Sequence, residues 1–264
     1  MMPLRRLTIC AFVLIGATAL ASQTGDSPFP PSLSINPFAG SDPYQDCVNA
    51  IAKKPDDAFE MALAWRDHGG GVQAEHCAAL ALINLDEPGE AASRLDALAQ
   101  RQNAGTAAER SALLGQAGNA WLLANQPENA EAAFSAALRL SAQDAEMWVD
   151  RARARAARQD WANAEADLNT AIGLNKGKAD FFVLRASARH AQGNMDGYKS
   201  DIDSALAIDP TYPDALVERG ALKVQSGDAA GARADWLQVL LRAPDSPAAE
   251  SVRRQIETLE VHDR

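Results

Sequence analysis

Histidine, cysteine and aromatic residues are scarce in this chain of 264 residues. It has four histidines and three cysteines, and phenylalanine, tryptophan and tyrosine together make up 6% of the sequence. It has no GxSxG, HExxH or CxxCH motif and no glycine-rich phosphate-binding loop. Its many carboxylates are interpreted as a solvated helical surface. We therefore expect a protein that is not an enzyme and that needs no cofactor.

The sequence also lacks an apolar run of the ~20 residues that cross a membrane. The run at positions 7–20 follows two arginines and ends at small residues, the layout of a secretory signal peptide. We predict that residues 1–21 are a signal peptide, with an uncleaved anchor as the alternative. The mature protein is then expected in the periplasm or secreted, without stable membrane insertion after cleavage.

Two cysteines, Cys47 and Cys77, remain after cleavage. An exported chain with two cysteines favours a disulfide. A zinc site that combined both thiols with His68 and His76 is the alternative, but the sequence has no CxxC or HxxxH pair to support it. We predict a Cys47–Cys77 disulfide and no metal site.

Basic residues are outnumbered by acidic ones, and the formal net charge is -10. Such a chain repels phosphate backbones, so nucleic acid is excluded as a partner. Residues 22–41 are rich in proline, serine and glycine and have no periodic apolar positions. They are interpreted as a flexible linker.

What the sequence does contain is a repeat of 34 residues. Residues 111–144, 145–178, 179–212 and 213–246 align without gaps. Large apolar residues recur in one column of this alignment, and small residues recur four positions later. Further columns lie on one face of a second helix. The columns are Leu114, Trp148, Phe182 and Leu216; Gly118, Ala152, Ala186 and Gly220; Ala130, Ala164, Tyr198 and Ala232; Phe134, Leu168, Ile202 and Trp236; and Ala137, Ala171, Ala205 and Val239.

This order of large, small, alanine and aromatic columns resembles the tetratricopeptide repeat family, whose unit is 34 residues long. The resemblance implies an all-α, right-handed α-solenoid of antiparallel helical hairpins. A divergent fifth copy is predicted at 72–105, so that the repeats span 72–246. Five extra residues, 106–110, separate this copy from the next. A degenerate hairpin at 42–71 is expected to precede the repeats, and a capping helix and tail at 247–264 to follow them.

Arginine and aspartate recur 16 positions apart in three of the repeats. Where the arginine column has Ala117, the aspartate column has Ala133. This joint replacement predicts an ion pair inside each hairpin, with an anion-binding ladder as the alternative. The predicted pairs are Arg151 with Asp167, Arg185 with Asp201 and Arg219 with Asp235.

The family resemblance also implies a concave surface lined by the first helix of each repeat. An apolar floor with scattered polar groups suits a peptide or a partner helix. We expect a protein or peptide partner to bind in this groove in the cell envelope, and a self-associating structural scaffold is the alternative. The predicted groove residues are Asn119, Leu122, Leu123, Val149, Arg153, Ala156, Val183, Ser187, His190, Val217, Val224 and Gln225.

Overall fold

The computed structural model describes residues 42–262, and the regular structure in this part of the chain is entirely helical. The predicted signal peptide and linker lie outside the described residues. A short π-helical segment, η1 (Arg66–Gly70), joins α2 to α3. The α-helices of residues 42–262 are α1 (Pro43–Ile51), α2 (Pro55–Trp65), α3 (Gly71–Asn84), α4 (Pro88–Ala99), α5 (Ala107–Leu123), α6 (Pro127–Leu140), α7 (Ala145–Ala157), α8 (Trp161–Leu174), α9 (Ala179–Ala191), α10 (Met195–Ile208), α11 (Pro213–Gln225), α12 (Ala229–Arg242) and α13 (Pro247–His262).

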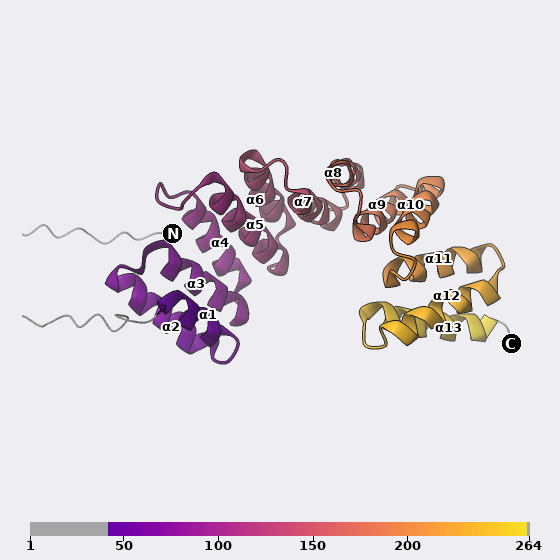
Figure 1. Cartoon of the computed structure of the whole chain (residues 1–264), viewed down its shortest axis with the longest axis horizontal. Coiled ribbons are helices and arrows are strands. Elements are labelled where there is room, and N and C mark those ends of the chain that lie inside the picture. The colour runs from indigo at the N-terminus through magenta and orange to yellow at the C-terminus, as the bar shows by residue number, and fades with distance from the viewer. Residues whose placement is uncertain (1–41, 263–264) are drawn as a thin grey trace, which may run out of the picture. The chain divides into compact units, whose positions relative to one another are not determined.

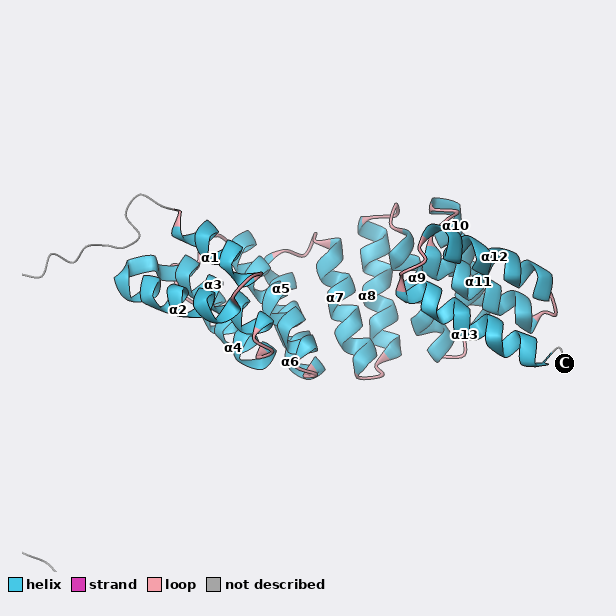
Figure 2. Cartoon of the chain, turned by 90° about the horizontal axis from the view of Figure 1, so that it is seen from below, coloured by secondary structure: helices cyan, strands magenta, loops and turns pink. Residues whose placement is uncertain are grey.

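Each helix packs against the next along the described chain, from α1 and α2 to α12 and α13 (Figures 1 and 2). The pairs α5 and α6, α7 and α8, α9 and α10, and α11 and α12 are hairpins joined by short turns. Among the described residues, no helix is both long enough and apolar enough to span a bilayer. The predicted all-α solenoid of helical hairpins is confirmed.

The turns inside the hairpins depend on one residue in the left-handed region. Asn125, Gly193 and Gly227 occupy three of these turns and have φ values of 56°, 78° and 85°. Gln159 occupies the equivalent position with φ of 61°, although it is neither glycine nor asparagine. The backbone reverses direction at this point in each hairpin, and the second helix begins two residues later.

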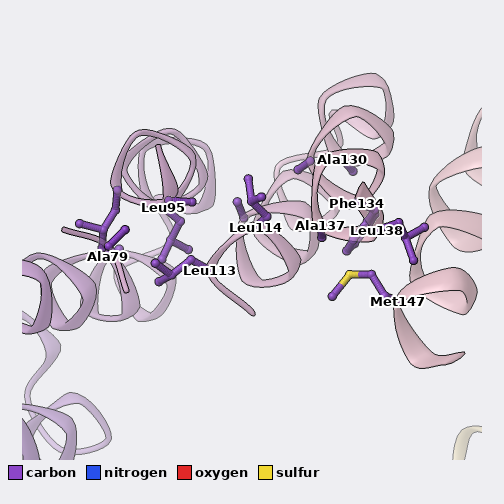
Figure 3. Packing of buried hydrophobic residues seen from close by; sticks show 14 of the residues in the cluster. Ala79, Leu95, Leu113, Leu114, Ala130, Phe134, Ala137, Leu138 and Met147 are labelled. Carbon is purple, nitrogen blue, oxygen red and sulfur yellow. The ribbon is translucent and has the colours of Figure 1, made fainter. Parts of the chain in front are cut away.

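The small-residue column of the first helices faces large side chains of the second helices. A Cβ atom on Gly118 would overlap the ring of Phe134, and one on Gly220 would overlap the indole of Trp236. Where the large residue is aliphatic, as in Leu168, the small residue is alanine. Glycine therefore accompanies the aromatic rings because only the missing Cβ leaves room for them. Figure 3 shows Phe134 within this packing.

Buried apolar contacts also join successive hairpins. Leu138 of α6 and Met147 of α7 belong to the same buried cluster (Figure 3). Gly115 of α5 also meets Met147, whose methyl group occupies the space that a Cβ would need. Since each hairpin buries its apolar face on its neighbours, the buried residues form a series of four clusters along the stack.

The segment 106–110 extends a helix. Thr106 caps α5 through a reciprocal pair of hydrogen bonds with Glu109, and the remaining residues form the first turn of this 17-residue helix. The inserted residues thus lengthen a first helix instead of separating two repeats.

Candidate functional site

The arginine and aspartate columns meet inside the hairpins. Arg151 donates two hydrogen bonds to Asp167, with nitrogen–oxygen distances of 2.9 and 2.7 Å. The distances are 3.0 and 2.6 Å for Arg185 and Asp201, and 2.9 and 2.7 Å for Arg219 and Asp235. The three carboxylates are only 1–2% exposed. These arginines and aspartates therefore bind each other inside the fold. The alternative, an anion-binding ladder, would need arginines that are free to contact a ligand.

A second cation reaches each of these carboxylates from one turn further along the first helix. Arg155 lies 2.8 Å from Asp167, Arg189 lies 2.9 Å from Asp201, and Lys223 lies 2.8 Å from Asp235. These cations are 34 residues apart and so occupy one column of the repeat alignment. Burial raises the pKa of Asp235, but hydrogen bonds from Arg219 and Lys223 outweigh burial, so that the pKa is below its usual value.

The predicted groove residues all lie on first helices, but their exposure differs. Asn119, Leu123, Arg153, Ser187, His190 and Gln225 are exposed, and Leu122, Ala156, Val183 and Val224 are half-buried. Val149 and Val217 are buried, because they pack against neighbouring helices of the stack. These two valines therefore belong to the core of the stack and offer a partner almost no surface.

Four of the predicted groove residues line one small hollow between α7, α8 and α9. Val149, Arg153, Ala156 and Ser187 contribute to it, with Trp161 at the start of α8. Its volume is about 70 Å³, several times the ~10–15 Å³ that one water molecule needs. Apolar side chains form most of its wall, so the hollow suits a small apolar group.

A larger pocket of about 460 Å³ lies between α11, α12 and α13. Val224 and Gln225 line it from α11, and Trp236 lines it from α12. The Trp236 indole donates a hydrogen bond to the buried Val217 carbonyl at 3.2 Å, so its polar atom is satisfied. The capping helix contributes Gln255, Thr258 and Leu259. An apolar pocket with a few polar groups at its edge is typical of ligand and peptide sites.

A carboxylate lies beside the first hollow. Asp150 of α7 accepts a hydrogen bond from Arg153 at 2.7 Å, and the side chain of Asn119 of α5 also lowers its pKa. Burial raises the pKa of Asp150 more than these two partners lower it. Burial also raises the pKa of Asp214 at the start of α11. Asp150 is ion-paired with Arg153, so this pair carries no net charge, whereas Asp214 is an exposed carboxylate.

Several lining residues were not predicted from the sequence. Trp161 stood apart from the core columns, and that was the one available signal that it has another role. Leu184 and Leu259 carry no signal of this kind, because an apolar residue at helical spacing is typical of the core. Six of the predicted groove residues line neither hollow: Asn119, Leu122, Leu123, Val183, His190 and Val217.

The Sγ atoms of Cys47 in α1 and Cys77 in α3 lie next to each other, and both residues are fully buried. His76 takes part in a different network, with nitrogen–oxygen distances of 2.8 Å to the Tyr44 hydroxyl and 2.6 Å to Gln116. Over residues 42–262, no group of three or more histidine, cysteine, aspartate or glutamate side chains is placed to hold a metal ion.

Solved structures show what this fold resembles. PilF from Pseudomonas aeruginosa has a TM-score of 0.59 at 14% identity, over 81% of this chain and 96% of PilF. MamA from Desulfovibrio magneticus RS-1 has a TM-score of 0.56 at 17% identity, over 67% of this chain and 98% of the MamA chain. The OM64 tetratricopeptide domain from Arabidopsis matches 45% of this chain and 98% of its own length, at 24% identity and a TM-score of 0.44.

No protein-family model matches the sequence, and no curated protein matches it. At these low identities the structural likeness concerns the fold alone. The tetratricopeptide-repeat architecture expected from the 34-residue period is confirmed.

Proposed function

Because the chain has the tetratricopeptide-repeat fold, we propose that it binds a peptide segment of a partner protein along its first helices. The apolar pocket between α11, α12 and α13 is the observation that supports this proposal most directly. An apolar side chain of the peptide enters this pocket, and a basic residue of the peptide lies near the exposed carboxylate of Asp214 at the start of α11. We assign no catalytic step, cofactor or nucleic acid to the chain.

We place this binding in a cell envelope, since residues 1–21 have the layout of a signal peptide. The same compartment permits a disulfide, and we propose that Cys47 and Cys77 form one. Mass measurement of the mature, non-reduced protein tests both points. We expect a chain that starts at Ser22 and lacks two thiol hydrogens, whereas an intact leader or two free thiols would contradict the respective proposal.

Filling the pocket is expected to weaken peptide binding. Peptides selected from a displayed library on the mature protein provide the ligand. Replacing Thr258 with tryptophan inserts an indole among the lining residues and should raise the Kd at least tenfold, since the peptide side chain loses its place (ΔΔG of ~1.4 kcal/mol). Isothermal titration calorimetry measures the change.

Glu257→Trp provides the matched control. Glu257 is an exposed neighbour on the same helix and does not line the pocket, so its Kd should stay close to that of the unaltered protein. If both variants bind the selected peptides as tightly as the unaltered protein, the pocket is not the peptide site. A circular dichroism spectrum confirms that both remain helical.

A second function, self-association into a scaffold, is favoured by one surface feature. Leu237 and Leu241 lie one turn apart on α12 and are 52% and 81% exposed. Adjacent exposed leucines on one helix face are typical of contact surfaces. Under this alternative, a second copy of the chain covers them.

Light scattering at increasing protein concentration tests self-association. If α12 forms the contact, the mass rises with concentration, and Leu241→Gln returns it to that of the monomer because the apolar contact is lost. Leu123→Gln is the control, since Leu123 is 66% exposed on α5. A constant monomer mass at all concentrations would reject the scaffold function.

A further inference from the structure

The junction between α10 and α11 differs from the two junctions before it. Where α7 meets α6, Arg155 donates to Glu131 at 3.0 Å. Where α9 meets α8, Arg189 donates to Glu165 at 2.8 Å. One repeat later, the two equivalent positions are Lys223 and Lys199. Lys199 thus places an amine where the earlier repeats have the glutamate that joins them. Among the described residues, no ion pair involves Lys199.

A second link between repeats is also missing at this junction. Arg151 Nη1 donates to Ser135 at 3.2 Å, and Arg185 Nη1 donates to Asn169 at 2.7 Å. The position equivalent to Ser135 and Asn169 holds Asp203. Among the described residues, the hydrogen bonds of Arg219 go only to Asp235. These two polar links are therefore absent at this junction, where a different hydrogen bond, from the Tyr198 hydroxyl of α10 to Glu218 of α11, joins the helices.

A cleft lies where these links are absent. The Arg219 side chain is 34% exposed, against 14% and 15% for Arg151 and Arg185 in the earlier copies. Lys223 is likewise 29% exposed, against 16% for Arg155. The cleft has a volume of about 440 Å³ and is lined by Lys199, Asp203, Arg219, Leu222, Lys223, Gln225 and Ser226.

The balance of charge at this cleft is positive, although the whole chain carries -10. Three cations, Lys199, Arg219 and Lys223, lie at its surface together with Asp203. The buried Asp235 binds Arg219 and Lys223 from the side of α12. Three positive and two negative groups leave one positive charge, so an incoming anion is favoured.

We propose that this cleft binds a carboxylate of a partner peptide, an aspartate or glutamate side chain, between Lys199 and Lys223. The ligand supplies the group that Glu131 and Glu165 supply within the chain at the two earlier junctions. The half-buried Leu222 provides an apolar contact for the methylene groups of the ligand. This site is separate from the pocket between α11, α12 and α13, and only Gln225 lines both.

The test uses the mature protein and three probes: an acetylated and amidated tetraglutamate peptide, glutarate, and inorganic phosphate. Titrations followed by amide NMR should shift the signals of α10 and α11 with the peptide and, more weakly, with glutarate. Lys199→Glu places the missing carboxylate on the chain itself. This variant should bind the peptide at least tenfold more weakly, and its melting temperature should rise by a few degrees, because the introduced carboxylate can pair with Lys223.

Lys176→Glu is the matched control, because it changes the net charge equally at an exposed position outside the cleft. It should leave the Kd for the tetraglutamate peptide within about twofold. Equal weakening in the two variants would mean that only the overall charge matters and would overturn the proposal. Phosphate that binds as tightly as the peptide would overturn the assignment to a carboxylate. Thr258→Trp should not affect this binding, which separates the site from the peptide groove.

Discussion

Replacing Asp201 with alanine is expected to destabilise the folded chain by about 3–5 kcal/mol. Its carboxylate is 1% exposed and accepts hydrogen bonds from Arg185, at 2.6 and 3.0 Å, and from Arg189 at 2.9 Å. Both arginines are less than 20% exposed, so the variant leaves two cations with little water to replace the lost partner. Urea unfolding followed by circular dichroism measures the loss.

The double variant Arg185→Ala and Asp201→Ala is the control for this expectation. Residues 111–144 already have Ala117 and Ala133 at the equivalent positions, and both are buried in the core. Arg189 keeps Glu165 as a partner at 2.8 Å in the double variant. We therefore expect the double variant to be more stable than Asp201→Ala alone. A double variant that is less stable by the sum of the two single changes would show that the pair is not coupled.

Asp235→Ala should have a smaller effect than Asp201→Ala. Its partners Arg219 and Lys223 are 34% and 29% exposed, so water can solvate them after the carboxylate is removed. The difference between the two aspartates would measure how far the cleft between α10 and α11 opens the third ion-pair cluster to solvent.

Removing the proposed Cys47–Cys77 disulfide is expected to cost about 3–4 kcal/mol, because it would close a loop of 30 residues. The link joins α1 to α3, so the loss should be confined to the amino-terminal end of the stack, where each hairpin contacts only its neighbours. Hydrogen exchange of the Cys47→Ala and Cys77→Ala double variant should accelerate in α1 and α2 and remain unchanged in α7 and α8.

Two further measurements make this expectation specific. Dithiothreitol should accelerate exchange in α1 and α2 of the unaltered protein and should leave the double variant unchanged. If it affects neither protein, the two sulfurs do not form a stabilising link. Uniform acceleration across all helices would instead show that the stack unfolds as one unit, against the local effect expected of a repeat protein.

Much of the fold could be predicted because the 34-residue repeat is defined by the spacing of residues that are close together in the sequence. Large and small residues four positions apart define one helix face, and this relation needs no knowledge of the neighbours. The turns at Gly193 and Gly227 could be predicted for the same reason, since a left-handed residue is a local requirement. Gln159 could not, because a glutamine gives no local sign of positive φ.

The candidate sites depend on contacts between repeats, and there the sequence alone was insufficient. The 16-residue spacing was enough to match each arginine with an aspartate of its own hairpin. It did not show that Arg155 and Arg189 share these carboxylates and also reach Glu131 and Glu165 of the preceding hairpins. The replacement of that glutamate by Lys199 can be interpreted only once the structure shows which residue of the next repeat this position faces.

The sequence by itself therefore determined the helices, their pairing into hairpins and the order of the stack, because these follow from periodicity within one 34-residue unit. The tertiary structure decided which surfaces stay open. Val149 and Val217 are buried by neighbouring helices, whereas α13 leaves a pocket beside Trp236 and the junction at Lys199 leaves a cleft. Whether a surface stays open depends on the side chains that two neighbouring repeats bring together, and the sequence of one repeat does not contain that information.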